Sequence, residues 1–273
     1  MNNLKQRTLT GITLIIAIVI LINLGTYTFT ALLLAINLGG VLEFYRLVRV
    51  TKAGIFLGVL SGTSLVLTVV LVMTGLLGWQ TLFIQIPILF LLYVTELYSN
   101  NPRPFENLAY TFMGILYITL PLCFFAALAF LPQGNGYGTQ VISGCFFMIW
   151  AGDTCAYVAG KYLGRHLLFE RISPHKTWEG SVGGMLGTVL TAIVLSRFLF
   201  ILQIETWLAL AVIIVVTGTY GDFFKSMLKR SLDVKDTGTL LPGHGGILDR
   251  FDSLLGSAPF LFSYLVLYGH FKV

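Results

Sequence analysis

The polar segment Ser226–Asp252 holds most of the side chains that could carry chemistry in this chain. It reads SMLKRSLDVKDTGTLLPGHGGILDRFD and contains four basic and four acidic residues beside His244. Basic groups neutralise phosphate oxygens, and carboxylates hold Mg²⁺ through a few oxygens while the substrate supplies the others. This combination predicts a site for a polyphosphate and a divalent metal ion.

Three aspartates are spaced to hold that metal ion. Asp249 and Asp252 are three residues apart, so they share one face if the segment is helical. Asp222 lies near the polar end of the preceding apolar stretch and can meet that face across a helix interface. The glycines of the GHGG run at 243–246 let the backbone approach an anion, and a helix N-terminus presents free N–H groups to it.

Anionic lipid headgroups offer an alternative explanation for the basic residues. Lysines beside a membrane, such as Lys225 and Lys229, often bind only headgroups. This alternative does not explain Asp222, Asp249 and Asp252, because carboxylates next to an anionic surface need a partner. Ionisable side chains within membrane segments generally mark a functional site.

A second polar segment lies upstream. Asp153 and Lys161 border one apolar stretch, and Ser173–Gly180 (SPHKTWEG) opens the next. Serine before proline is typical of a helix start, so we expect a helix to begin at this pair. Trp178 is a usual anchor at a membrane interface. Structural roles explain much of this segment, and Lys176 and Asp153 are the residues for which we expect a function.

The composition requires a membrane around these segments. The chain has 273 residues, of which 56% are hydrophobic and only 11% are charged, and its mean hydropathy is +0.85. Soluble domains carry about 25% charged residues. A chain so poor in charge cannot cover a water-facing surface, so we expect the lipid bilayer to be its main solvent.

Apolar runs of about 20 residues predict transmembrane helices. The chain has nine candidates, at about 8–24, 27–46, 54–76, 79–98, 107–131, 140–160, 180–201, 206–228 and 253–270. No clear cleavage site follows the first run, so we expect a retained span. The predicted fold is an all-α polytopic membrane helix bundle of about nine transmembrane helices. It forms one domain, 1–273, whose C-terminal half (about 140–273) carries the catalytic motifs.

The basic residues predict the orientation. With a cytoplasmic N-terminus, fifteen of the seventeen lysines and arginines lie inside, and only Arg197 and Lys272 lie outside. The two longest polar segments, about 161–179 and 225–252, are then both cytoplasmic. We therefore expect the active face on the cytoplasmic side, and the compact chain suggests a bacterial inner membrane.

The segment Ser226–Asp252 resembles the signature of the phosphatidate cytidylyltransferases, also called CDP-diacylglycerol synthases. The chain matches all thirteen fixed positions of that pattern, which are Ser226, Lys229, Arg230, Lys235, Asp236, Gly238, Pro242, His244, Gly245, Gly246, Asp249, Arg250 and Asp252. The resemblance extends more loosely to Asp153–Tyr157, to Gly160-Lys161 and to Ser173–Gly180. His175 stands where many relatives carry lysine.

The resemblance implies a nucleotidyl transfer in which the phosphate of phosphatidic acid attacks the α-phosphorus of CTP and pyrophosphate leaves. It implies Mg²⁺, which K⁺ can accompany, held by Asp222, Asp249 and Asp252. Lys229 and Arg230 join these aspartates as catalytic residues. Substrate binding is expected from Asp153, Lys161, Ser173, Lys176, Lys235, Asp236, His244, Gly245, Gly246 and Arg250.

The chemistry explains why no nucleophilic side chain is needed. A phosphate monoester has a second pKa of about 6, so it is mostly dianionic at neutral pH. The reaction needs relief of repulsion between two anions, which metal ions and basic side chains provide.

Two other functions compete with this one. A CTP-dependent polyprenol or phytol kinase would transfer the γ-phosphoryl group and release CDP. A transporter would show internal repeats and polar groups near the bilayer midplane, whereas these charges cluster at one face. We expect CTP, phosphatidic acid and the bilayer as partners and no nucleic acid, and a homodimer is left open.

Overall fold

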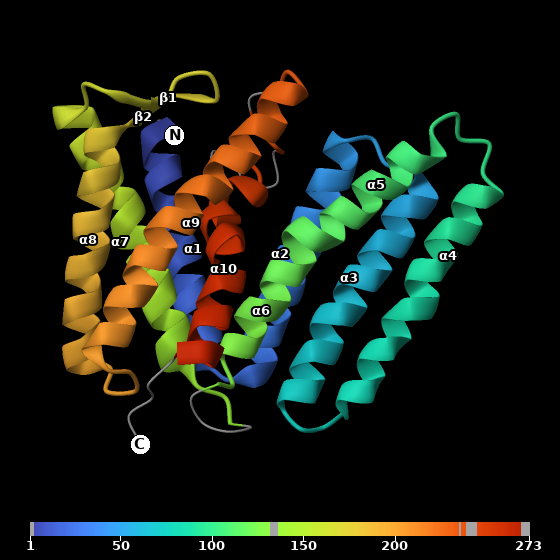
Figure 1. The fold of residues 1–273 in the computed structure, drawn as a ribbon, viewed down its shortest axis with the longest axis horizontal. Coiled ribbons are helices and arrows are strands. Elements are labelled where there is room, and N and C mark those ends of the chain that lie inside the picture. The colour runs from blue at the N-terminus through green and yellow to red at the C-terminus, as the bar shows by residue number, and fades with distance from the viewer. Residues whose placement is uncertain (1–2, 132–135, 235, 239–244, 269–273) are drawn as a thin grey trace. The chain divides into compact units, whose positions relative to one another are not determined.

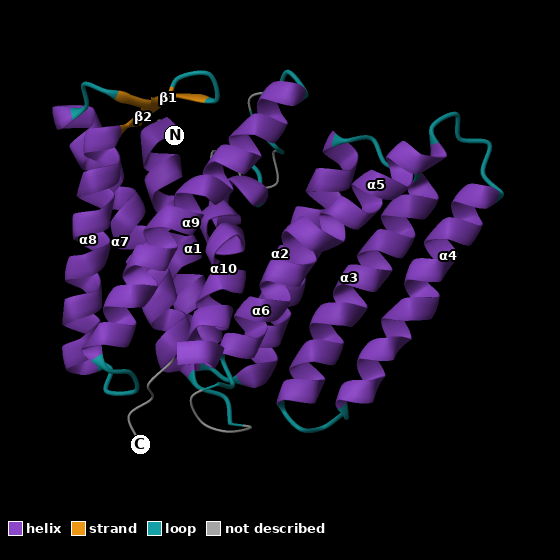
Figure 2. Cartoon of the chain, in the orientation of Figure 1, coloured by secondary structure: helices purple, strands orange, loops and turns teal. Residues whose placement is uncertain are grey.

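The described residues form helices and one small hairpin of strands (Figures 1 and 2). The computed structural model describes residues 3–131, 136–234, 236–238 and 245–268. These described residues fall into two compact units. The first unit lies within Met1–Phe130, Asn135–Tyr137 and Asp236–Arg250, and the second within Leu131–Gly134, Gly138–Lys235 and Phe251–Val273.

The first unit is built from the N-terminal helices. They are α1 (Asn3–Asn23), α2 (Thr26–Leu47), α3 (Lys52–Met73), the 3₁₀-helix η1 (Trp79–Ile84), α4 (Gln85–Leu97), α5 (Pro104–Gly114), the π-helical η2 (Ile115–Thr119) and α6 (Leu120–Leu128). Local sequence sets several of their ends. The Thr51 side chain caps α3 by accepting a hydrogen bond from the Gly54 N–H at 3.2 Å, and Pro104 opens α5, where its missing N–H costs nothing.

Small residues let the helices of the first unit approach one another around Tyr45. This tyrosine of α2 is fully buried, and a Cβ at either Gly58 or Gly114 would overlap its ring. Its hydroxyl donates to the Thr111 carbonyl oxygen of α5 at 2.7 Å. A buried hydroxyl needs such a partner, so this bond fixes α2 against α5.

The second unit contains α7 (Thr139–Leu163), β1 (Leu167–Phe169), β2 (Ser173–Thr177), α8 (Trp178–Phe198) and α9 (Ile204–Ser231). The last helix, α10 (Leu248–Tyr268), begins with residues of the first unit and continues in the second. Glycines line the contact between α7 and α8: a Cβ at Gly184 would lie 3.0 Å from the Ala156 Cβ and 3.2 Å from the Gly152 carbonyl oxygen. This close backbone approach is typical of packed membrane helices.

The all-α fold class is confirmed, but the predicted start of the helix at Ser173 is wrong. Ser173–Thr177 forms β2, which pairs antiparallel with β1 in the registers Leu167↔Thr177 and Phe169↔Ser173. Helix α8 begins at Trp178, because the Thr177 hydroxyl caps it by accepting from the Gly180 N–H at 3.1 Å. In a two-stranded ribbon a proline is tolerated, so the Ser-Pro pair lies in the strand.

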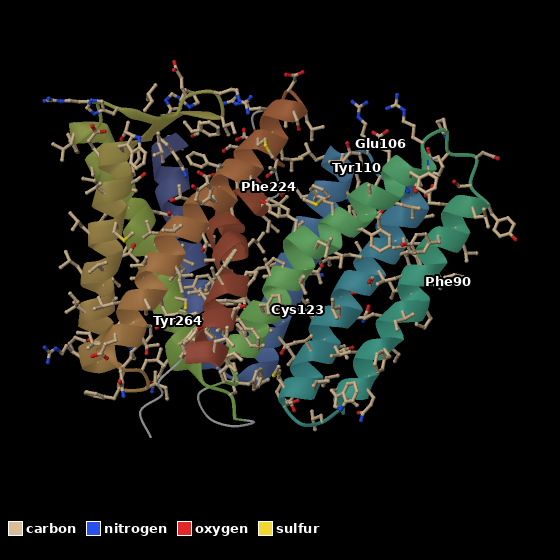
Figure 3. The ribbon with its side chains drawn as sticks, viewed as in Figure 1. Phe90, Glu106, Tyr110, Cys123, Phe224 and Tyr264 are labelled. Carbon is tan, nitrogen blue, oxygen red and sulfur yellow. The ribbon has the colours of Figure 1, made fainter. Side chains whose placement is uncertain are left out.

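Eight helical segments of the described residues are long and apolar enough to span a membrane. They are Thr26–Leu47, Lys52–Met73, Trp79–Leu97, Pro104–Leu128, Thr139–Leu163, Trp178–Phe198, Ile204–Ser231 and Leu248–Tyr268. The first predicted span lies on α1, where the apolar stretch Gly11–Asn23 is shorter. Large apolar side chains such as Phe90 on α4, which is 62% exposed, point outward as lipid contact requires (Figure 3). The protein is a polytopic membrane helix bundle.

Candidate active site

A buried lysine lies between two aspartates in the second unit. The Lys225 Nζ is 2.9 Å from the Asp222 Oδ1 and also forms an ion pair with the Asp252 Oδ2. Lys176 of β2 forms an ion pair with the other oxygen of Asp222. Side chains from a strand and two helices thus alternate in charge, and both the half-buried Asp222 and the buried Asp252 have a cationic partner. Buried charges are tolerated when they are paired in this way.

Two glycines bring Asp222 and Asp252 together. A Cβ at Gly221 of α9 would lie 2.7 Å from the Asp252 carbonyl oxygen and 3.0 Å from the Gly256 Cα of α10. The backbones of the two helices therefore touch beside the two aspartates. Within α9, Asp222 and Lys225 are three residues apart and share one face.

The β1–β2 hairpin is fixed to α9 by aromatic contacts as well as by charge. The Lys176 Nζ lies 4.9 Å from the centroid of the Phe223 ring, within the range of a cation–π interaction. Phe169 of β1 meets the same ring edge-on, with the centroids 5.7 Å apart. Lys176 is therefore held over α9, with its side chain 31% exposed, whereas that of Lys225 is only 8% exposed.

A second polar cluster lies in the first unit around Thr237. The Asp249 Oδ2 accepts from the Thr237 N–H at 3.1 Å and from the Gly246 N–H at 3.4 Å, and it lies 3.0 Å from the Thr237 hydroxyl. Glu43 of α2 contacts the same hydroxyl. Gly245 has φ of 81°, a conformation that favours glycine, and this turn leads the chain into α10.

The chain as a whole matches a known family. The sequence model of the cytidylyltransferase family matches residues 5–268. The chain belongs to the cytidylyltransferase family. The resemblance seen in the signature segment is therefore confirmed over nearly the whole length.

Several cytidylyltransferases of bacteria are similar to this chain. It is 32% identical over 274 residues to the phosphatidate cytidylyltransferase of Bacillus subtilis (strain 168), covering 98% of this chain and 100% of the relative. It is 34% identical over 265 residues to that of Staphylococcus haemolyticus, covering 94% and 97%. A 165-residue match to that of Staphylococcus epidermidis strain RP62A reaches 39% identity and covers 60% and 61%.

The structure divides the predicted site residues of this cytidylyltransferase between the two clusters. Asp222, Asp252 and Lys176 meet in the second unit. Asp249 lies with Gly245 and Gly246 in the first.

The remaining predicted site residues lie around these clusters or outside the described residues. Lys229 and Ser173 are half-buried on α9 and β2. The exposed ones are Asp153 and Lys161 on α7, Arg230 on α9, Asp236 after it and Arg250 on α10. The Lys161 Nζ lies 5.5 Å from the centroid of the Tyr162 ring. Lys235 and His244 lie outside the described residues.

The headgroup explanation is wrong for Lys225. Its side chain is buried between Asp222 and Asp252 instead of reaching lipid. The three-residue spacing from Asp222 was the available signal, because such residues meet on a helix. Sequence reasoning also missed Glu43 and Thr237. A lone glutamate in an apolar stretch was the signal for Glu43, and Thr237 lies between two matched positions of the signature.

The donor set of the second unit fits a magnesium ion that is completed by a substrate. Among the described residues, no three His, Cys, Asp or Glu side chains gather as a metal-binding group. Mg²⁺ typically takes only one or two carboxylates together with substrate phosphates and waters. Asp222 and Asp252, which share Lys225, supply two carboxylates. The chemistry of these oxygens suits Mg²⁺, and the ion itself stays a prediction.

Proposed function

We propose that the protein transfers CMP from CTP to phosphatidic acid, forming CDP-diacylglycerol and pyrophosphate in phospholipid biosynthesis. The observation that carries this proposal is the cluster in which Lys176 and Lys225 alternate with Asp222 and Asp252. Asp252 belongs to the signature segment, and Asp222 and Lys225 directly precede it in the sequence. Relatives that match almost the full length carry the name phosphatidate cytidylyltransferase. Their names favour this reaction over the kinase and the transporter.

The cluster suits a reaction between two anions. The phosphate of phosphatidic acid is mostly dianionic at neutral pH and needs no strong base. Repulsion from the phosphates of CTP is the main obstacle, and fixed positive charge lowers it. Lys176 of the cluster, with Lys229 and Arg230 further along α9, would supply such charge next to the bilayer.

The two lysines of the cluster have different tasks in this proposal. Lys225 is the more buried and contacts both aspartates, so it serves as their internal counter-ion. Lys176 is more exposed and forms an ion pair with one oxygen of Asp222, so it is the cation that can turn to a substrate phosphate. The hairpin holds it in place through Phe223.

Magnesium completes the proposal. Asp222 and Asp252 would hold the ion, with Asp249, three residues before Asp252 on α10, as the predicted third ligand. When bound, Mg²⁺ would neutralise phosphate oxygens and so favour departure of pyrophosphate. K⁺ stays a prediction from the family resemblance.

We place this chemistry at the cytoplasmic face of a bacterial inner membrane. The ion pair between Lys176 and Asp222 supports a common face, because it joins the segment 161–179 to the polar end of α9. In a cysteine-free background, a cysteine at Val234 should stay unlabelled when an impermeant thiol reagent is added outside intact cells. A cysteine at Tyr137 should be labelled, and the reverse pattern would contradict the orientation.

The reaction itself is tested with purified protein in detergent, phosphatidic acid, CTP and Mg²⁺. CDP-diacylglycerol and pyrophosphate should form in equal amounts, and both should require CTP and a divalent ion. Release of CDP with a phosphorylated isoprenoid alcohol would replace this proposal by the kinase.

A further inference from the structure

Glu43 is a buried acid in a helix far from the signature in sequence. It lies on α2, in the apolar stretch Thr26–Leu47, and is only 5% exposed. A carboxylate in such a place is costly unless strong hydrogen bonds hold it. The hydrogen-bond partners of Glu43 must therefore offset the cost of burying its carboxylate.

Both carboxylate oxygens of Glu43 receive hydrogen bonds from the signature segment. The Oε2 accepts from the Ile247 N–H at 2.8 Å, and the Oε1 accepts from the Leu248 N–H at 3.3 Å. These N–H groups lie at the start of α10, where the first turn of a helix lacks acceptors of its own. A negative charge is also favoured at this end of the helix dipole. Glu43 therefore caps α10 from another helix.

Two glycines of the signature leave room for the Glu43 carboxylate. A Cβ at Gly238 would lie 2.8 Å from the Glu43 Oε2. A Cβ at Gly246 would overlap the Glu43 Oε1 and the Thr237 hydroxyl. The backbone at Gly238 and at Gly246 is thus packed against the Glu43 carboxylate. A side chain at either glycine would displace this carboxylate.

Thr237 connects Glu43 to Asp249. Its hydroxyl contacts the Glu43 Oε1 and lies 3.0 Å from the Asp249 Oδ2, and its N–H donates to the same Asp249 oxygen at 3.1 Å. The position of Asp249 is therefore set by the helix start that Glu43 caps and by the threonine that Glu43 contacts.

We propose that Glu43 is a positioning residue for the cytidylyl transfer, which fixes Thr237 and the start of α10 so that Asp249 is held in its working place. The inference rests on the proposed function. It assigns to helix α2 a part in positioning Asp249, although α2 carries none of the signature.

Glu96 provides a matched control in the same unit. It is also 5% exposed, and its carboxylate accepts hydrogen bonds from Asn107, Ser99 and Asn101. These partners, like the Thr51 hydroxyl that also donates to this carboxylate, lie in the loop after α4, within α5 or before α3, and none is in the signature. If replacing any buried carboxylate were enough to lower activity, substitution of Glu96 should lower it as much as substitution of Glu43.

The test compares Glu43→Gln with Glu96→Gln in purified, detergent-solubilised protein. Glutamine keeps the size of Glu43 but presents an NH₂ group to one of the N–H donors. We expect kcat to fall about 100-fold, as small misplacements at a reacting centre do, with the KM for CTP little changed. Hydrogen–deuterium exchange of the peptide 245–252 should become faster. Glu96→Gln should change neither quantity, whatever it does to thermal stability.

A second pair of variants keeps the test decisive if Glu43→Gln does not fold. Thr237→Val removes the hydroxyl that Glu43 contacts, and Thr237→Ser retains it. We expect Thr237→Val to have a much lower kcat than the wild type, and Thr237→Ser to keep most of the wild-type kcat. Normal kcat in a folded Glu43→Gln or in Thr237→Val would overturn the inference. An inactive wild-type protein would contradict the proposed function instead, and the exchange of peptide 245–252 would still test the contacts of Glu43.

Discussion

The two aspartates at the start of α10 are held in contrasting ways. Asp252 forms an ion pair with Lys225, which also serves Asp222. Asp249, three residues earlier, is held by the N–H groups of Thr237 and Gly246, which are neutral donors. Neutral donors orient a carboxylate without cancelling its charge. Asp252 is therefore held by an ion pair with a lysine that it shares with Asp222, whereas Asp249 is oriented by backbone N–H groups of the segment that precedes its helix.

The largest effect is expected from removing either charge that the proposed metal site needs. Asp222→Asn and Asp249→Asn should each abolish turnover, because each replaces a charged oxygen ligand by a neutral amide. Formation of CDP-diacylglycerol by the purified variants measures this, and their yield in membranes shows that they fold and insert. If both variants kept near-normal activity and Mg²⁺ dependence, the metal assignment would be wrong even though the family is established.

A large loss of stability is expected when Lys225 is replaced by methionine. Removing one partner from a buried ion pair typically costs about 3–5 kcal/mol, because the other charge stays buried. Here Asp252, whose side chain is 12% exposed, would lose its lysine. Arg103→Met is the control, since its pair with Glu106 is exposed and such pairs contribute about 0–1 kcal/mol. Thermal unfolding in detergent compares the two, and an equal loss of stability would contradict the buried cluster.

The smallest effect is expected at Asp236. This aspartate precedes Thr237 but is exposed, unlike the half-buried Asp249. Surface substitutions typically change stability by no more than about 0.5 kcal/mol. Asp236→Asn should therefore unfold like the wild type and retain far more activity than Asp249→Asn. A loss as complete as that of Asp249→Asn would show that Asp236 contacts a substrate or metal directly.

The parts of the fold that depend on local pattern could be predicted from the sequence. Long apolar runs indicate helices at 54–76 or 206–228 whatever their neighbours are, and the spacing of the signature identifies the family. The helix start at Ser173 was predicted wrongly because a Ser-Pro pair also fits a short strand. Pairing with Leu167–Phe169 and the cap at Thr177 decide between the two, and neither is visible in the local pattern.

The parts of the site that depend on tertiary contact could not be predicted. Lys225 becomes buried only because Gly221 and Gly256 let α9 and α10 touch. The contact between Glu43 and Thr237 joins positions that are 194 residues apart. A single sequence contains no pattern that pairs such distant residues. The signature therefore identified the chemistry but not Glu43, which caps α10.

The position of a label in the products tests the central claim most directly. CTP labelled at the α-phosphorus should transfer its label to the lipid, while label at the γ-phosphorus should appear in pyrophosphate. The Asp222→Asn variant should transfer neither label. Appearance of the γ-label in a lipid, with the α-label left in CDP, would contradict cytidylyl transfer by this protein.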